Sequence, residues 1–281
     1  MRSCKGFTLI ELSIVLVIIG LIIGGVLAGR DLIKAAELRY IISQKDKYTV
    51  AANAFRNKYN CIPGDCSNAI TFFGYPGGNA SDNYTSSCVA FVGLDNTHTC
   101  NGDGNGMIGF GGPTDLDVLD EEGLLFWHHL SLAGMIESGN LTPRPAVLNS
   151  GSSAWELPGI NIPASRLSSN VGFSQFYLCI TSGAAYYHNG NCTHTFFYGA
   201  QDPNPDSNYL GLAMYPALSA LDGYNIDKKL DDGLPAIGSV TTVPPGGNYL
   251  DSCSSSTNMA TATYTVTTGG ITCALMFKGG F

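Results

Sequence analysis

Charged residues are scarce in this chain of 281 residues: Asp, Glu, Lys and Arg make up 13%, against about 25% in an average soluble protein. Hydrophobic residues make up 44%, so the chain is not of the highly charged, weakly hydrophobic kind that stays disordered. The formal net charge is −8, with 14 Lys and Arg against 22 Asp and Glu. This balance excludes a protein attracted to nucleic acid by its overall charge, and we expect no nucleic-acid partner.

Signatures of catalysis and of zinc binding are also missing. The sequence contains no G-x-S-x-G nucleophile motif, no P-loop and no dinucleotide-binding fingerprint. It has no C-x-x-C pair, and its histidines are not spaced as zinc ligands. We therefore expect neither an enzyme nor a zinc protein.

The most informative feature that is present is a long apolar run near the N-terminus. Residues 7–29 read FTLIELSIVLVIIGLIIGGVLAG and contain one charged residue, Glu11. As a helix this run would be about 35 Å long, which is enough to cross a bilayer. A short leader, MRSCKG, precedes it and carries Arg2 and Lys5.

Three interpretations of this segment compete. A secretory signal peptide cut near Ala28 would have a longer apolar core than usual. A plain membrane anchor is the second interpretation. Neither explains Glu11, because a lone carboxylate in hydrocarbon costs about 2.5–3.5 kcal/mol. The third interpretation gives Glu11 a partner of opposite charge in a neighbouring molecule.

The third interpretation comes from a resemblance. Residues 5–11, Lys-Gly-Phe-Thr-Leu-Ile-Glu, closely resemble the signature of type IV prepilins and of the related pseudopilins of type II secretion. The resemblance implies that a prepilin peptidase cuts after Gly6 and that the new N-terminal Phe7 becomes N-methylated. It also implies that Glu11 pairs with the Phe7 ammonium group of a neighbouring subunit. Such a pairing fits the physics, because a buried charge is tolerable only when it is paired.

On this resemblance the chain is a structural subunit of a type IV pilus or of a type II secretion pseudopilus. The implied partners are prepilin peptidase, other pilin subunits including copies of itself, the inner-membrane assembly machinery, and the membrane before assembly. The implied location is the inner membrane with a periplasmic head, followed by an extracellular pilus or a periplasmic pseudopilus. The alternative is a minor pilin at the filament tip, with a head that acts as an adhesin or ligand-binding module.

The cysteines indicate an oxidising compartment. Cys4 lies in the leader, so cleavage after Gly6 leaves an even number, as expected for disulfides outside the cytoplasm. Several connectivities remain open, and we favour pairing in sequence order because each such pair brackets a turn-like segment. The favoured pairs are Cys61–Cys66, Cys88–Cys100, Cys179–Cys192 and Cys253–Cys273.

The predicted organisation is a leader over residues 1–6, a long helix over 7–59 and a head over 60–281. Residues 30–59 contain no Pro or Gly, and their apolar side chains recur at helical spacing. A second helix is predicted over 115–133 and a third over 216–230. Segments rich in aromatic and β-branched residues predict strands. These segments are 171–180, 192–200, 236–243, 261–268 and 271–277. The predicted class is α+β: one long helix on a mainly antiparallel sheet with loop insertions.

The segment Asn101-Gly-Asp-Gly-Asn-Gly is the best candidate for a ligand site in the head. It resembles the first half of a calcium-binding loop, in which side-chain oxygens at alternate positions converge on the ion. Calcium is therefore the one cofactor that the sequence suggests, and a plain Asn-Gly turn is the alternative. The expected ligands are Asn101, Asp103 and Asn105, with Asp115 or Asp117 completing the shell. The adjacent His128 and His129 are expected to be solvated or packed histidines, because neighbouring helix residues point apart.

Overall fold

The structure is a computed structural model of the chain, and it forms two compact units, residues 1–41 and residues 42–281. The residues that it describes are 6–74, 98–109, 121–137, 139, 141–142, 156–178, 187, 192–201, 213–245 and 253–281.

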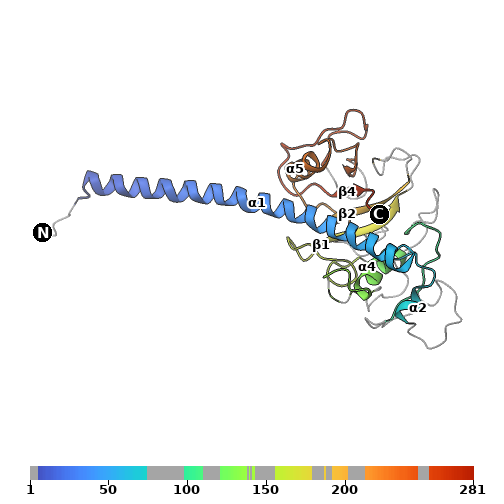
Figure 1. Cartoon of the computed structure of the whole chain (residues 1–281). Helices are drawn as coiled ribbons and strands as arrows, with labels where there is room; N and C mark the ends of the chain where they lie inside the picture. Colours follow the sequence, from blue (N-terminus) through green and yellow to red (C-terminus); the bar gives the residue numbers. More distant parts are fainter. Residues whose placement is uncertain are drawn as a thin grey trace, which may run out of the picture. The chain divides into compact units, whose positions relative to one another are not determined.

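One helix, α1, runs without interruption over Leu9–Tyr59 and contains 51 residues (Figure 1). At about 1.5 Å per residue its length is about 75 Å. It ends at Asn60, whose φ of 58° is the left-handed conformation that commonly terminates helices. The predicted long helix is thus confirmed, with its first residue at Leu9.

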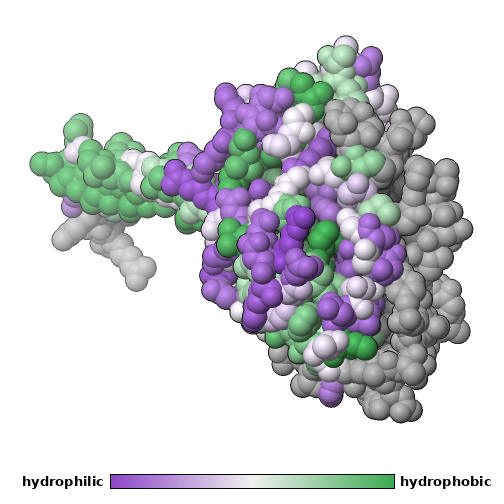
Figure 2. Space-filling model, turned by 45° about the vertical axis from the view of Figure 1, so that its right-hand side comes forward, coloured by the Kyte–Doolittle hydropathy of each residue, from purple (hydrophilic) through white to green (hydrophobic). Residues whose placement is uncertain are grey.

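The first part of α1 has no packing partner within the described chain. Every residue from Phe7 to Ala28 is exposed, and we call residues 7–28 the apolar segment. Figure 2 shows apolar side chains covering this end of the helix. Among the described residues, α1 is the one helix long and apolar enough to span a membrane.

The last part of α1, residues 42–59, belongs to the head, and we call it the head segment. Its buried side chains include Tyr48, Ala52 and Phe55. The Tyr48 ring meets Trp127 at 4.9 Å and Phe173 at 5.3 Å between ring centroids. The head segment therefore packs on both a second helix and the sheet.

The sheet of the head is antiparallel and has four strands in the order β1-β2-β4-β3. The strands are β1 (Val171–Leu178), β2 (Thr193–Ala200), β3 (Val240–Thr242) and β4 (Leu275–Lys278). Strand β1 is buried along nearly its whole length, so both faces of the sheet are covered. Phe173 and Tyr198 point toward the head segment, whereas Phe176 and Phe197 stack on the opposite face in a cluster with Met276.

Three shorter helices complete the described part of the head: α2 (Ala69–Phe73), α4 (Glu121–Leu132) and α5 (Ala220–Leu230). Helix α4 matches the predicted second helix from Glu121 onward, and the predicted residues 115–120 lie outside the described residues. Helix α5 matches the predicted third helix but begins later, because Ser219 caps its first turn by accepting a hydrogen bond from the Asp222 N–H.

The prediction of a strand over residues 261–268 is wrong. Only Tyr264 forms an isolated bridge, with Ser254, and the rest of the segment consists of turns and loop. Next to this bridge Thr265 donates to Cys253 and Thr263 accepts from Ser255, but the groups on either side bond locally: Ala262 donates to Asn258 and Thr268 donates to Thr265. Local turns therefore use the hydrogen bonds that a sheet ladder would need, although the residue types favour a strand.

Candidate functional site

The predicted cleavage site lies in exposed, non-helical chain. Gly6, Phe7 and Thr8 precede the first residue of α1, and the Phe7 side chain is 88% exposed. No helical hydrogen bond has to break for a peptidase to reach the bond between Gly6 and Phe7.

Glu11 has a local hydrogen-bond partner that the sequence analysis missed. Its Oε2 accepts hydrogen bonds from both the backbone N–H and the hydroxyl of Thr8, each at 2.8 Å. The Glu11 N–H in turn donates to the Thr8 Oγ at 3.3 Å. This reciprocal pattern is a capping box, and its signal in the sequence is Thr-x-x-Glu before an apolar run. Glu11 thus stabilises the start of α1 within a single chain.

Two of the predicted disulfides join described cysteines, Cys61–Cys66 and Cys253–Cys273. Cys100 and Cys192 are disulfide-bonded as well. Their predicted partners, Cys88 and Cys179, lie outside the described residues, so those two pairings stay predictions. The Cys61–Cys66 bridge closes a short loop directly after α1.

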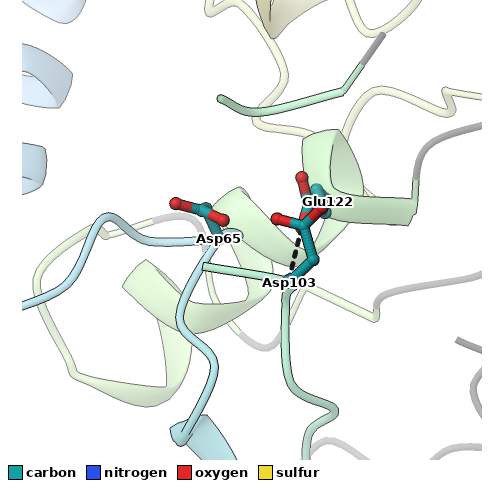
Figure 3. Close-up of side chains that lie close together, drawn as sticks. All are labelled: Asp65, Asp103 and Glu122. Atoms are coloured by element: carbon teal, nitrogen blue, oxygen red, sulfur yellow. Dashed lines mark hydrogen bonds between the residues drawn. The ribbon is translucent and has the colours of Figure 1, made fainter. Parts of the chain in front are cut away.

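Three segments meet at the end of the head segment, and each contributes one carboxylate. Asp65 comes from the Cys61–Cys66 loop and Glu122 from the first turn of α4. Asp103 comes from residues 101–106, which we call the Asn-Gly loop. One carboxylate oxygen of each lies within 4.8 Å of the other two, and we call these three residues the Asp65 cluster. Figure 3 shows the Asp65 and Asp103 carboxylates turned toward each other, with Glu122 beside Asp103.

Two glycines allow these segments to lie so close together. A Cβ on Gly102 would collide with the Gly64 carbonyl oxygen and the Asp65 Cα. A Cβ on Gly64, whose φ is +88°, would collide with the Glu122 carbonyl oxygen. Glycine is therefore required at both positions for the two loops and α4 to make backbone contact.

The Asp65 cluster holds two carboxylates out of water. Asp65 is 4% exposed and Glu122 is 5% exposed, whereas Asp103 is exposed. Burial and the adjacent Asp103 carboxylate raise the pKa of Asp65 to about 6. Glu122 accepts hydrogen bonds from the Asp103 N–H at 2.9 Å and the Gly109 N–H at 3.4 Å.

The predicted calcium ligands are distributed differently from the sequence expectation. Asp103 is in the cluster, but the Asn101 Oδ1 accepts a hydrogen bond from the Ile70 N–H, and the Asn105 Oδ1 accepts one from the Met107 N–H. Asp115 and Asp117 lie outside the described residues. The sequence analysis did not identify Asp65 and Glu122 as site residues. The one local signal was for Asp65, an acidic residue that follows Gly64 in the short loop closed by the Cys61–Cys66 disulfide.

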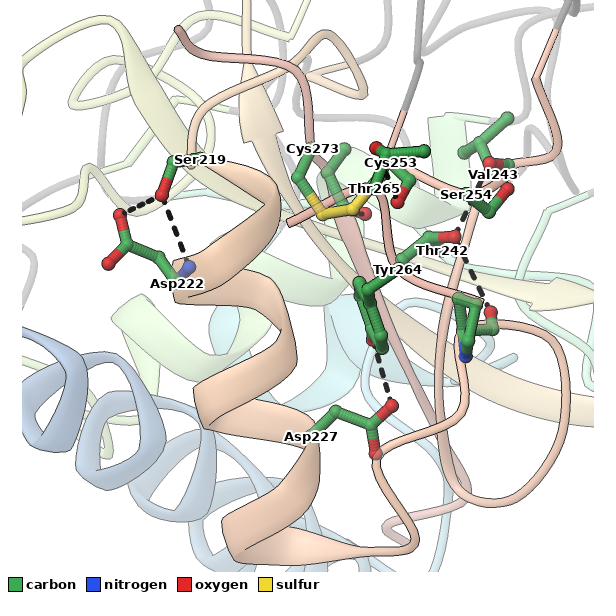
Figure 4. Close-up of a disulfide and its surroundings, with 12 residues drawn as sticks. Ser219, Asp222, Asp227, Thr242, Val243, Cys253, Ser254, Tyr264, Thr265 and Cys273 are labelled. Carbon is green, nitrogen blue, oxygen red and sulfur yellow. Dashed lines mark hydrogen bonds between the residues drawn. A yellow bond between two sulfur atoms is a disulfide. The ribbon is translucent and has the colours of Figure 1, made fainter. Parts of the chain in front are cut away.

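A second acidic group, Asp227, Asp231 and Asp232, lies at the end of α5, and we call it the Asp227 cluster. The Tyr264 hydroxyl donates to Asp227 at 2.8 Å, and the Cys253–Cys273 disulfide lies nearby (Figure 4). Backbone N–H groups of Val240 and Leu234 donate to Asp231 and Asp232, respectively. These hydrogen bonds give each carboxylate a structural role at the end of the helix.

The adjacent histidines His128 and His129 are packed in the head and are not solvated, which is one of the two expected alternatives. Both are fully buried in α4. The Gly64 N–H donates to the His129 Nδ1 at 2.9 Å, and the His129 Nε2 lies 3.2 Å from the Cys100 carbonyl oxygen. Burial, together with the adjacent His128, lowers the pKa of His129 to about 3, so His129 is neutral and connects α4 to two cysteine-containing loops.

Comparison with known proteins gives a match at the N-terminus. Residues 1–27 match the family model for the prokaryotic N-terminal methylation motif. No curated protein and no solved structure matches the chain. The match covers the leader, the residues around Gly6 and Phe7, and most of the apolar segment. The chain therefore carries at its N-terminus the signature of type IV prepilins and pseudopilins.

Proposed function

We propose that this chain is a structural subunit of a type IV pilus or a type II secretion pseudopilus. Prepilin peptidase cuts it between Gly6 and Phe7, and the mature chain polymerises through its apolar segment. The observation that carries this proposal is the exposed apolar segment of α1 directly after the cleavage site of the methylation motif.

Before assembly, the apolar segment needs a membrane. The helical residues 9–28 are about 30 Å long, which matches the hydrocarbon thickness of a bilayer. Large apolar side chains cover all sides of this helix, and none is buried against the described chain. Soluble monomers rarely expose apolar surface on this scale, so membrane lipid and then neighbouring apolar helices are the partners that this surface fits. The disulfides of the head fit a location on the oxidising side of that membrane.

Glu11 has two roles in this proposal. In the single chain it completes the capping box with Thr8. In the filament its carboxylate pairs with the Phe7 ammonium group of the next subunit, which cleavage after Gly6 creates. Pairing would offset the cost of enclosing both charges among apolar helices, and it would fix the register between subunits.

Two substitutions of Glu11 separate these roles. Glutamine keeps the capping geometry but loses the charge, whereas alanine loses both. We expect Glu11→Gln and Glu11→Ala to insert into the membrane normally and both to lose at least tenfold in filament yield, measured from sheared filaments by immunoblot. A normal yield from Glu11→Gln would assign Glu11 to capping alone, and a normal yield from Glu11→Ala would remove its role in assembly.

The intact mass and N-terminal peptide of the chain from its native membrane test the processing step. We expect a chain that begins at N-methylated Phe7, with its cysteines oxidised. A start near Gly29 would identify an ordinary secreted protein, and an unprocessed Met1 would leave an anchored domain. Immunogold labelling then locates the subunit: decoration along the shaft supports the structural role, and decoration confined to the tip would favour the adhesin.

A further inference from the structure

The Asp65 cluster concentrates negative charge in a small part of the head. Three carboxylates from three separate segments lie within 4.8 Å of one another. Among the ion pairs that the described residues form, none includes Asp65 or Asp103. At these distances the carboxylates repel one another, and burial of two of them strengthens the repulsion.

One oxygen in the cluster has no donor. The Asp65 Oδ2 accepts a hydrogen bond from the Gly106 N–H at 2.9 Å, but the Asp65 Oδ1 is buried and has no hydrogen-bond partner. A buried carboxylate oxygen without a donor costs free energy and calls for a water or an ion. This oxygen belongs to the carboxylate that Figure 3 shows turned toward Asp103. The Asp227 cluster differs in this respect, because none of its buried carboxylate oxygens lacks a hydrogen-bond partner in the described structure.

We propose that the Asp65 cluster binds one calcium ion, with Asp65, Asp103 and Glu122 each providing carboxylate oxygen. An all-oxygen, highly anionic donor set selects a hard cation over zinc or copper. Two of the three ligands come from loops, and calcium tolerates such irregular geometry better than magnesium, which demands a near-ideal octahedron. Water and backbone carbonyl oxygens complete the shell of six to eight ligands that calcium takes.

The ion would join parts of the head that are distant in the sequence. It bridges the Cys61–Cys66 loop, the Asn-Gly loop and the start of α4, and it offsets two of the three negative charges. Because the unfolded chain lacks this arrangement, calcium stabilises the folded head by mass action. Its loss would loosen the contact between the end of α1 and α4.

The test uses the full-length mature chain in detergent, with its disulfides intact and its cations removed by EGTA. Calorimetric titration with calcium chloride should show one ion bound per chain. About 10 mM calcium should raise the thermal midpoint by roughly 4–8 °C, because calcium sites of extracellular proteins have dissociation constants of about 0.1–1 mM. EGTA should reverse the rise, and magnesium should produce a smaller one.

Two variants place the ion. Asp65→Asn should lose the calcium response, whereas the matched control Asp232→Asn, in the Asp227 cluster, should keep it. If Asp65→Asn does not fold, Glu122→Gln serves in its place. The proposal is overturned if the wild-type chain shows neither binding heat nor a midpoint shift, if Asp65→Asn responds fully, or if Asp232→Asn alone loses the response. None of these outcomes depends on whether the chain assembles into filaments.

Discussion

The two ends of α1 obey the same helical geometry but have opposite surroundings. The apolar segment exposes apolar side chains on every side, whereas the head segment buries one face and keeps Arg56 and Lys58 exposed. The head segment is a helix whose partner is its own domain. The apolar segment is a helix whose partner lies outside the chain, and this difference separates what stabilises the fold from what serves assembly.

The largest effect should come from removing a buried aromatic ring of the head segment. Phe55 is fully buried and contacts Tyr59, Phe73 and His129 at centroid distances of 4.5, 6.1 and 6.0 Å. We expect Phe55→Ala to lower the free energy of unfolding by about 3–5 kcal/mol, measured by urea denaturation with tryptophan fluorescence.

Ile18→Ala is the matched control in the apolar segment, where Ile18 is half exposed. It should leave the unfolding of the head unchanged within about 0.5 kcal/mol. Equal destabilisation by the two substitutions would show that the apolar segment packs on the head. The two ends of α1 would then not differ in where their packing partners lie.

The parts of the fold that depend on neighbouring residues in the sequence were predicted better than the parts that depend on contacts between distant segments. The helix over Leu9–Tyr59 follows from local features, since residues 30–59 lack Pro and Gly and carry a helical stripe. The antiparallel strands β1 and β2 follow from β-branched and aromatic runs. The strand expected over 261–268 failed because local turns and the segment after Cys253 competed successfully for its backbone groups.

The candidate site was less accessible to sequence reasoning. Asp103 stands in a recognisable Asn-Gly loop, but Asp65 and Glu122 reach it only through the packing of two loops on α4. No spacing along the chain encodes contacts among positions 65, 103 and 122. The Thr8–Glu11 capping box, by contrast, is a local pattern, because Thr-x-x-Glu before an apolar run encodes it directly.

A second prediction compares a carboxylate in the core of the head with Glu11. Glu156 is buried, and its Oε2 accepts hydrogen bonds from the Ser174 hydroxyl and from the Ala213 N–H at 2.6 Å. Burial raises the pKa of Glu156 from 4.5 to about 7, although both hydrogen bonds lower it. The stability that this raised pKa confers is complete below pH 4.5 and is lost as the pH rises through 7.

Glu156→Gln should remove this pH dependence. Relative to wild type, we expect the variant to gain up to about 3 kcal/mol in free energy of unfolding between pH 4.5 and pH 8. The difference between the two proteins is the quantity to measure, because the other buried groups with shifted pKa values, such as Asp65 and Asp227, contribute equally to both. A difference that stays constant over this range would show that Glu156 does not titrate there. Glu11→Gln should show no such gain, since Glu11 is exposed and lies outside the head.

The smallest effect on the folded head should come from the glycines of the apolar segment. Gly20 and Gly24 form one G-x-x-x-G pair, and a Cβ added to either would meet no atom within 4 Å. In the single chain, Gly24→Ala therefore creates no clash and favours the helix by about 1 kcal/mol. The unfolding of the head should not change, since Gly24 belongs to the other compact unit.

In an assembled filament the same methyl group would separate helices that approach closely at glycine. We expect Gly24→Ala to reduce filament yield, although the chain is inserted and cut normally. Val50→Ala, at an exposed position of the head segment, should leave both filament yield and head stability unchanged. A normal yield from Gly24→Ala would mean that the glycine face makes no close helix contact. Cohesion would then rest on the large apolar side chains alone, and the contrast between the two ends of α1 would be one of hydrophobicity rather than of shape.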